Sequence, residues 1–142
     1  MHRKARAPRA VITIVAGFVL CYCGLPAHAA EVDWASFADL DTVEVVTTDE
    51  DGDERETTIW VRVVDGQGYI RTSLRSTWGD NTERFPDIAI RGGPIDHFVH
   101  ADLVTDDEQK QRIVEAFDEK YGTNFIIDWI RGDPRIFRLE PR

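Results

Sequence analysis

The chain has 142 residues, with 17 basic and 26 acidic side chains and a formal net charge of −9 at pH 7. Four basic residues and no acidic ones lie within the first 29 positions, so residues 30–142 carry 13 basic against 26 acidic side chains, a net charge of −13. This charge repels nucleic acid and anionic lipid surfaces, which we exclude as partners. The 113 residues after position 29 suit one domain with one core.

The first 29 residues have the organisation of a secretory signal peptide. A basic segment precedes an apolar run over residues 11–20 that continues to Leu25, and Ala27 and Ala29 occupy the positions that a signal peptidase reads. The run is shorter than the roughly 20 residues that span a bilayer, which argues against a membrane anchor. We expect cleavage before Ala30 and a periplasmic or secreted domain with no membrane contact.

Both cysteines, Cys21 and Cys23, lie inside the predicted signal peptide. Leu20 and Tyr22 stand where lipid attachment would require a small residue, so lipidation is not expected. The exported domain then has no disulfide and no cysteine nucleophile.

The first predicted element is a short helix capped by Asp33, which places Trp34, Phe37 and Leu40 on one side. Such a helix closes one end of the domain. Extended runs follow it and predict five strands, over residues 42–48, 57–64, 68–74, 85–91 and 95–104.

The segments between these strands are read as turns and loops. Residues 49–56 are highly charged and predict a solvated hairpin loop, whereas Asp65-Gly66 favours a tight turn with positive φ angles. Residues 75–84 are polar and predict a connecting loop or helical turn. Residues 92–94, Gly-Gly-Pro, join the last two of the five strands.

The second predicted helix covers residues 106–121. Thr105 and Glu108 have capping-box spacing, and Gly122 ends the pattern. Apolar residues recur between them at helical intervals, at Ile113, Val114, Phe117 and Tyr121. A further short helix from Thr123 to Trp129 and a sixth strand over 135–139 complete the chain.

Consecutive hairpins followed by a helix and a returning strand predict a mainly β, α+β domain. The expected architecture is an antiparallel sheet of about six strands that curls into a small barrel, with the helix near 106–121 packed on it.

Two segments carry a family resemblance. The block from Ile59 to Ser73, followed by Trp78, resembles DUF2255, a family of uncharacterised proteins, and residues 132–141 are similar to its ending. That family looks related to the FMN-binding split-barrel proteins, which include pyridoxamine-phosphate oxidases and F420-dependent reductases. The resemblance implies a split barrel, an FMN or F420 cofactor, and a homodimer with the site between two subunits.

The resemblance also implies a phosphate site at the end of the third strand. The matching positions are Arg71, Thr72 and Ser73, with Arg75 or Arg84 as a later cation. A guanidinium and a hydroxyl at one strand end can grip a phosphate through charge-assisted bonds, and strand alternation puts Arg71 and Ser73 on one face. We expect the Arg71 guanidinium to face the phosphate rather than a structural carboxylate. The alternative is a polar strand end whose arginines pair with acidic residues.

Two tryptophans are candidates to stack on a flavin ring. Trp60 lies on a predicted strand and is assigned to the core, whereas Trp78 lies in a polar segment and is the better ligand candidate.

Neither metal-like pattern is convincing. His97 and His100 are three residues apart on a strand, so they point to opposite faces, and no third ligand accompanies them. In the acidic run from Asp49 to Asp53, Gly52 comes too early for a calcium loop and Trp60 occupies the twelfth position. We expect no metal site, and hydrolase motifs are also missing.

The sequence therefore predicts an exported split-barrel domain that binds a flavin-like or other phosphorylated small molecule, as an oxidoreductase acting by hydride transfer. The alternative is a non-catalytic binding domain that has lost the flavin. No catalytic residue is assigned. No twin-arginine pair is present, so the chain would cross the membrane unfolded and acquire any flavin afterwards.

Overall fold

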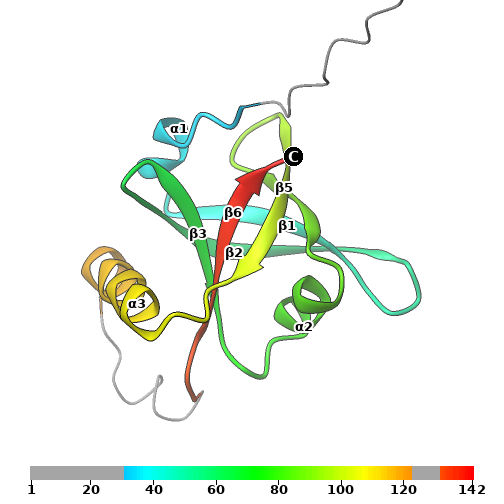
Figure 1. The fold of residues 1–142 in the computed structure, drawn as a ribbon. Helices are drawn as coiled ribbons and strands as arrows, with labels where there is room; N and C mark the ends of the chain where they lie inside the picture. Colours follow the sequence, from blue (N-terminus) through cyan, green and yellow to red (C-terminus); the bar gives the residue numbers. More distant parts are fainter. Residues whose placement is uncertain (1–30, 123–131) are drawn as a thin grey trace, which may run out of the picture.

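The computed structural model describes residues 31–122 and 132–142. The predicted signal peptide and the predicted helix from Thr123 to Trp129 lie outside this part of the chain. Figure 1 shows the described residues as a small barrel with helices around it. Its elements are α1 (Ala35–Ala38), β1 (Thr42–Thr48), β2 (Glu54–Val64), β3 (Gln67–Thr72), α2 (Thr77–Arg84), β4 (Asp87–Arg91), β5 (Asp96–Leu103), α3 (Asp107–Tyr121) and β6 (Arg135–Pro141).

The strands form a closed barrel in the order β1-β2-β3-β6-β5-β4, and all neighbours are antiparallel. A three-stranded meander and the β4–β5 hairpin supply five strands, and β6 inserts between β3 and β5 to close the ring. The sequence-based prediction of an α+β barrel of about six strands with a helix near 106–121 is confirmed.

Alternation along the strands fills the barrel interior. Val43 and Val45 of β1 and Ile88 and Ile90 of β4 are each 3% exposed or less, while the residues between Val43 and Val45 and after Ile90 are more exposed. Inward side chains of β2, β3, β5 and β6 complete the core, including Ile59, Val61, Ile70, Val99, Phe137 and Leu139. β-branched residues at a period of two account for both the strands and their register.

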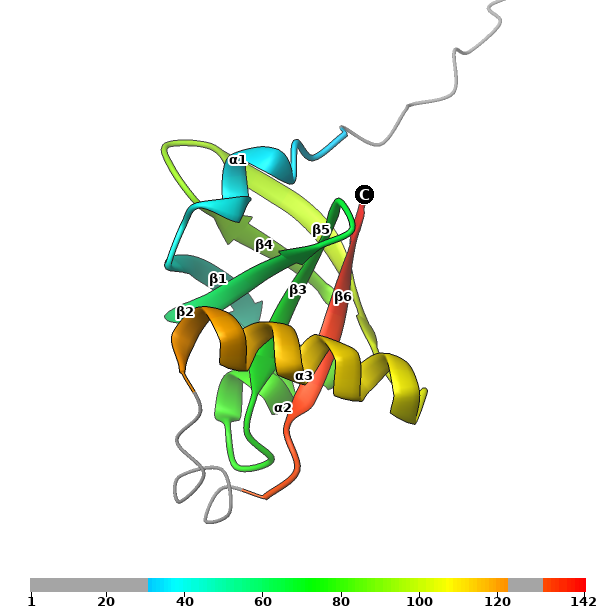
Figure 2. The same cartoon turned by 90° about the vertical axis from the view of Figure 1, so that its left-hand side faces the viewer.

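A second, smaller core lies outside the barrel, under α3. Ile113 and Phe117 of the helix are fully buried against Tyr69 of β3 and Ile136 of β6. Figure 2 shows α3 lying across the strands on this side. Consecutive residues of β3 and β6 are therefore buried, because these strands are covered on both faces.

The two shorter helices lie at opposite ends of the barrel (Figures 1 and 2). Trp34 and Phe37 join the interior core at the α1 end, and the Trp34 ring approaches Gly68 so closely that a Cβ there would lie 2.3 Å from it. At the α2 end, Trp78 packs against the core and the buried Asn81 amide donates to Thr47 Oγ1 at 3.4 Å.

Several local predictions require correction. β3 ends at Thr72 rather than 74, and β4 begins at Asp87 rather than 85. β2 begins at Glu54 rather than 57, because backbone pairing with β1 continues through charged residues whose side chains stay exposed. The α3 cap is Asp106 rather than Thr105, since the Asp106 carboxylate accepts from Gln109 N at 2.7 Å. Of the loop or helical turn predicted for residues 75–84, the helical alternative holds, and residues 77–84 form a two-turn helix, α2, capped by Ser76.

The tight turn between β2 and β3 is confirmed. Asp65 and Gly66 have φ angles of 52° and 76°, as expected when a two-residue hairpin turn joins twisted strands. In residues 31–122 and 132–142, no helix has the length and apolar character needed to cross a membrane.

Candidate functional site

Strands β2 and β3 separate partway along their length. They pair from the turn as far as Val61 and Ile70, after which the remainder of β2 pairs with β1 and the end of β3 pairs with β6. Figure 1 shows β2 leaving β3 and entering the long hairpin with β1. We call this opening the β2–β3 split.

A pocket of about 280 Å³ lies at the β2–β3 split, and we call it the split pocket. Of its described lining residues, five carry a hydroxyl, one carries a guanidinium, two carry an indole ring and one is aliphatic. These residues are Thr42, Thr58, Ile59, Trp60, Arg71, Thr72, Ser73, Ser76 and Trp78.

Four of the six predicted binding residues meet in this pocket: Arg71, Thr72, Ser73 and Trp78. The two later cations do not. Arg84 pairs with Glu50 in the β1–β2 hairpin, because helix α2 carries it about 12 Å along its axis away from Ser76. Arg75 is exposed and is not among the described residues that line the pocket.

Arg71 points outward from β3 toward helix α3. Its Nη1 donates to Asp118 Oδ1 at 2.8 Å, and the two side chains are 11% and 22% exposed. We expected this guanidinium to face a phosphate and not a structural carboxylate. The second part of this prediction was wrong, because α3 packs on this face of β3 and brings Asp118 to Arg71. Its contact with a phosphate stays a prediction.

The hydroxyls of the split pocket come from both sides of the opening: Thr42 and Thr58 from β1 and β2, and Thr72, Ser73 and Ser76 from β3 and the connection to α2. Thr72 is 5% exposed and donates to the Ser73 carbonyl at 3.3 Å, while the Ser76 hydroxyl accepts from Gly79 N at 3.3 Å. β3 ends at Thr72, so Ser73 reaches the pocket from the connection to α2 and not through strand alternation.

Arg135 fixes one wall of the pocket and was missed by the sequence analysis. Its guanidinium donates to Asp80 Oδ1 at 2.7 Å, to Glu83 Oε1 at 3.0 Å, and to the carbonyls of Ser73 and Ser76 at 2.9 and 3.1 Å. It is only 9% exposed. In the sequence it opens a strand of alternating arginines and gives no signal of this role.

Trp60 was assigned to the core, and this was wrong. Ile59 and Val61 point into the barrel, so alternation turns Trp60 outward, where it is 46% exposed. Its ring stacks on Tyr121 with centroids 4.6 Å apart and planes within 4°. Trp78, the other tryptophan of the pocket, is partly buried and packs from α2 against the barrel core.

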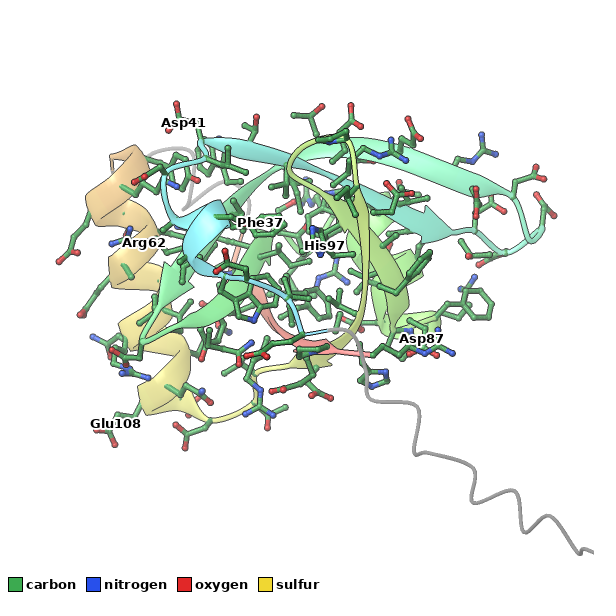
Figure 3. The ribbon with its side chains drawn as sticks, turned by 90° about the horizontal axis from the view of Figure 1, so that it is seen from above. Phe37, Asp41, Arg62, Asp87, His97 and Glu108 are labelled. Atoms are coloured by element: carbon green, nitrogen blue, oxygen red, sulfur yellow. The ribbon has the colours of Figure 1, made fainter. Side chains whose placement is uncertain are left out.

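The two histidines of β5 lie on different faces, as predicted. The His97 ring contacts Phe37 edge-on at 5.2 Å, whereas His100 Nδ1 lies 2.7 Å from Asp87 Oδ1. Figure 3 shows His97 near Phe37, with Asp87 farther along the barrel. Over residues 31–122 and 132–142, no group of three or more histidine, cysteine or acidic side chains is arranged to hold a metal ion.

The acidic loop between β1 and β2 is held by hydrogen bonds to the Asp49 carboxylate from neighbouring residues. The Asp49 carboxylate accepts from the backbone N–H groups of Asp51 and Asp53, both at 3.0 Å, and from Arg55 Nε at 2.8 Å. The Arg55 hydrogen bond lowers the pKa of Asp49. These contacts account for the loop as a structural hairpin.

No family model and no curated protein matches this chain. The resemblance to DUF2255 therefore stays a prediction.

Solved structures do match, and they share the split-barrel fold. The haem storage protein HutZ from Vibrio cholerae is 19% identical, with a TM-score of 0.60 over 73% of this chain and 83% of that one. A Listeria innocua protein assigned as a pyridoxamine 5′-phosphate oxidase is 16% identical, with a TM-score of 0.57 over 76% and 89%. An F420 reductase is 15% identical, with a TM-score of 0.59 over 79% and 94%. These likenesses establish the fold.

Proposed function

We propose that this protein is an exported split-barrel domain that binds a flavin-like or other phosphorylated small molecule in the split pocket. The observation that carries the proposal is the composition of that pocket, whose lining residues include five with hydroxyl side chains, Arg71 and two tryptophans. Guanidinium and hydroxyl donors suit a phosphate, and indole rings suit a planar heterocycle.

FMN and F420 are the cofactors that the proposal favours. Ser73, Ser76 and Thr72 offer hydroxyls for a phosphate, and Trp60 and Trp78 offer apolar ring surfaces. When bound, such a cofactor supplies the hydride chemistry of an oxidoreductase, and the protein supplies its position and electrostatic surroundings. The structural neighbours named for pyridoxamine 5′-phosphate oxidase and F420 reductase support this choice.

We also propose a homodimer, on the resemblance to split-barrel proteins. A volume of about 280 Å³ is just below the range of roughly 300 to 1,000 Å³ that is typical of small-molecule sites. The described residues of one chain would enclose one part of a cofactor of FMN size. We propose that a second copy completes the site, and light scattering that shows a strict monomer with bound flavin would contradict this.

A non-catalytic binding domain is the second candidate. The observation that favours it is the Arg71–Asp118 ion pair, because the carboxylate competes with a phosphate for the guanidinium. Under this alternative the pocket retains its shape and binds a phosphorylated molecule without redox chemistry.

Titration of purified protein tests the proposal. FMN and F420 are added in turn, and flavin or deazaflavin fluorescence is followed together with heat release. We expect saturable binding of at least one of them. Binding without reduction of the cofactor by any added hydride donor would favour the second candidate. No saturable binding of either would refute a flavin site.

Export is proposed on the sequence of residues 1–29. N-terminal sequencing of the protein recovered from a secreting host is expected to begin at Ala30. A chain that begins at Met1 and stays with the membrane would overturn the signal peptide, and cleavage directly before Cys21 or Cys23 would establish lipidation.

A further inference from the structure

Over residues 54–60, strand β2 has a backbone edge with no partner strand in the described part of the chain. On one side these residues pair with β1, whereas pairing with β3 on the other side covers only residues 61–64. Figure 1 shows this part of β2 in the long hairpin that extends away from β3. We call the uncovered side of residues 54–60 the open edge.

Antiparallel alternation determines which backbone groups point to the open edge. Asp49 N donates to the Asp53 carbonyl at 2.9 Å, so every second residue of β2 from Arg55 onward directs its N–H and C=O groups to β1. The residues between them direct these groups to the open edge: Glu54, Glu56, Thr58 and Trp60. Within residues 31–122 and 132–142, no turn, loop or side-chain hydrogen bond reaches these groups.

Half of the open edge lacks the usual protection of an exposed strand. Charged side chains often keep open edges from pairing with other chains, and residues 54–56 fit that role. Residues 57–60, Thr-Thr-Ile-Trp, carry no charge and no proline, and β-branched and aromatic residues favour strand pairing. Thr58 and Trp60 also line the split pocket, so space is available beside this half.

The side chains beside the open edge are mainly acidic. Glu54 and Glu56 lie on the outer face of β2, and no ion pair of the described chain includes Glu54. Arg91 Nη1 lies 3.2 Å from Glu56 Oε1. The same guanidinium also pairs with Glu44 and Asp96, so one cation serves three carboxylates. An added strand is therefore stabilised by basic side chains opposite the glutamates.

A second copy of β2 is a poorer occupant of the open edge than a basic peptide. In a two-fold antiparallel pairing, directly opposite residues lie on the same face. Glu54 and Glu56 therefore never oppose Arg55 of the other copy, which lies on the inner face. The two chains would also repel each other, because each carries a formal net charge of −9 over its full sequence.

We propose that the open edge of β2 binds an extended basic peptide segment of another protein as an added strand. Main-chain hydrogen bonds to β2 supply the affinity, and basic side chains beside Glu54 and Glu56 supply the selectivity. This site goes beyond the proposed small-molecule function, because it needs no cofactor.

The test follows amide hydrogen exchange by NMR on the purified protein, with a capped seven-residue peptide of alternating lysine and valine as the probe. We expect the peptide to slow exchange about tenfold or more at the amides that face the open edge, those of Glu54, Glu56, Thr58 and Trp60. The amides between them are already bonded to β1, so their exchange should change little. No slowing at the first set, or equal slowing along residues 54–60, would overturn the proposal.

Altered peptides separate strand pairing from charge attraction. A peptide of alternating glutamate and valine should bind at least about tenfold more weakly. Methyl groups on either the lysine amides or the valine amides give two further peptides of equal charge. In an added strand only one of these sets faces β2, so one methylated peptide should lose binding and the other should keep it. Equal effects of the two methylations would contradict an added strand.

Thr58→Pro blocks the open edge from the protein side. Proline removes an N–H group that faces the open edge and spares those bonded to β1, so the thermal unfolding temperature should stay close to that of the wild type. Peptide binding should be lost. Thr58→Val, the matched control, keeps the N–H group and should keep binding. If Thr58→Pro does not fold, the wild-type exchange pattern and the methylated peptides decide.

Exchange without peptide tests the other occupants of the open edge. Protection that rises with protein concentration would assign the edge to a second copy, and protection at every dilution would assign it to the chain itself. Either result overturns the peptide site. A protein that binds FMN but shows no effect of the peptide would refute this inference and leave the proposed function intact.

Discussion

Strand β3 borders two regions of different composition, one along its edge with β6 and one where it separates from β2. Where it pairs with β6 under α3, the chain forms an apolar contact in which Ile113, Phe117 and Ile136 are fully buried. Where it parts from β2, the chain keeps hydroxyls around an opening and leaves Trp60 half exposed. Hydrophobic burial explains the first region as a source of stability. The second keeps polar side chains around an opening, where we propose that a ligand binds.

The largest expected effect on stability comes from a substitution in the buried region under α3. Phe117→Ala removes a fully buried ring and should lower the free energy of unfolding by about 3 to 5 kcal/mol. Urea denaturation followed by circular dichroism measures it. Phe98→Ala, on the exposed outer side of β5, is the control and should cost less than about 1 kcal/mol. Equal losses in the two variants would contradict the assignment of the α3 contact as a core.

Arg71 belongs to both regions, because it lines the split pocket and pairs with Asp118 of α3. If it contacts the phosphate, Arg71→Ala should weaken FMN binding by about 1.5 to 3 kcal/mol and riboflavin binding much less. Asp118→Asn removes the competing carboxylate and should leave FMN binding intact or strengthen it. Calorimetric titration of the three proteins decides. Equal losses for both ligands would assign Arg71 a structural role through Asp118.

Arg135 tests whether the wall of the split pocket depends on a buried guanidinium. Arg135→Met leaves two carboxylates and two carbonyls without their donor and should destabilise the protein by about 1 to 2 kcal/mol. Hydrogen exchange should increase in residues 73–84. Arg84→Met, which breaks an exposed pair with Glu50, should change stability by less than about 0.5 kcal/mol. Faster exchange in the Arg84 variant alone would contradict this assignment.

Lowering the pH should destabilise the fold through surface carboxylates that lie outside both regions. Hydrogen bonds from Arg55, His100 and Arg91 lower the pKa values of Asp49, Asp87 and Asp96, respectively, below 3.8. A carboxyl whose pKa is lower in the folded state stabilises the fold above pH 3.8, and this contribution disappears as the pH falls through the folded-state value. Thermal unfolding temperature should therefore decline below about pH 4. A decline that is already complete at pH 5 would contradict it.

The sequence was most informative where local chemistry decides the structure. The bounds of β1, the Asp65-Gly66 turn and the Gly122 end of α3 follow from β-branching, positive φ angles and helix termination. The returning strand β6 was also predicted. Its position between β3 and β5 is a long-range pairing that periodicity does not encode.

The binding residues were harder to predict. Trp60 lies between two inward residues, so alternation indicates an outward position, whereas its large apolar ring favours the core. Arg84 and Arg135 carry identical side chains, yet one forms an exposed ion pair and the other a buried network. Only the tertiary contacts of α2 distinguish them.

A crystal structure of the protein with FMN tests the central claim most directly. We predict the isoalloxazine ring against Trp60 and the phosphate among the hydroxyls of Ser73, Ser76 and Thr72 in the split pocket. FMN bound at another place on the barrel, with the split pocket free of it, would contradict the account.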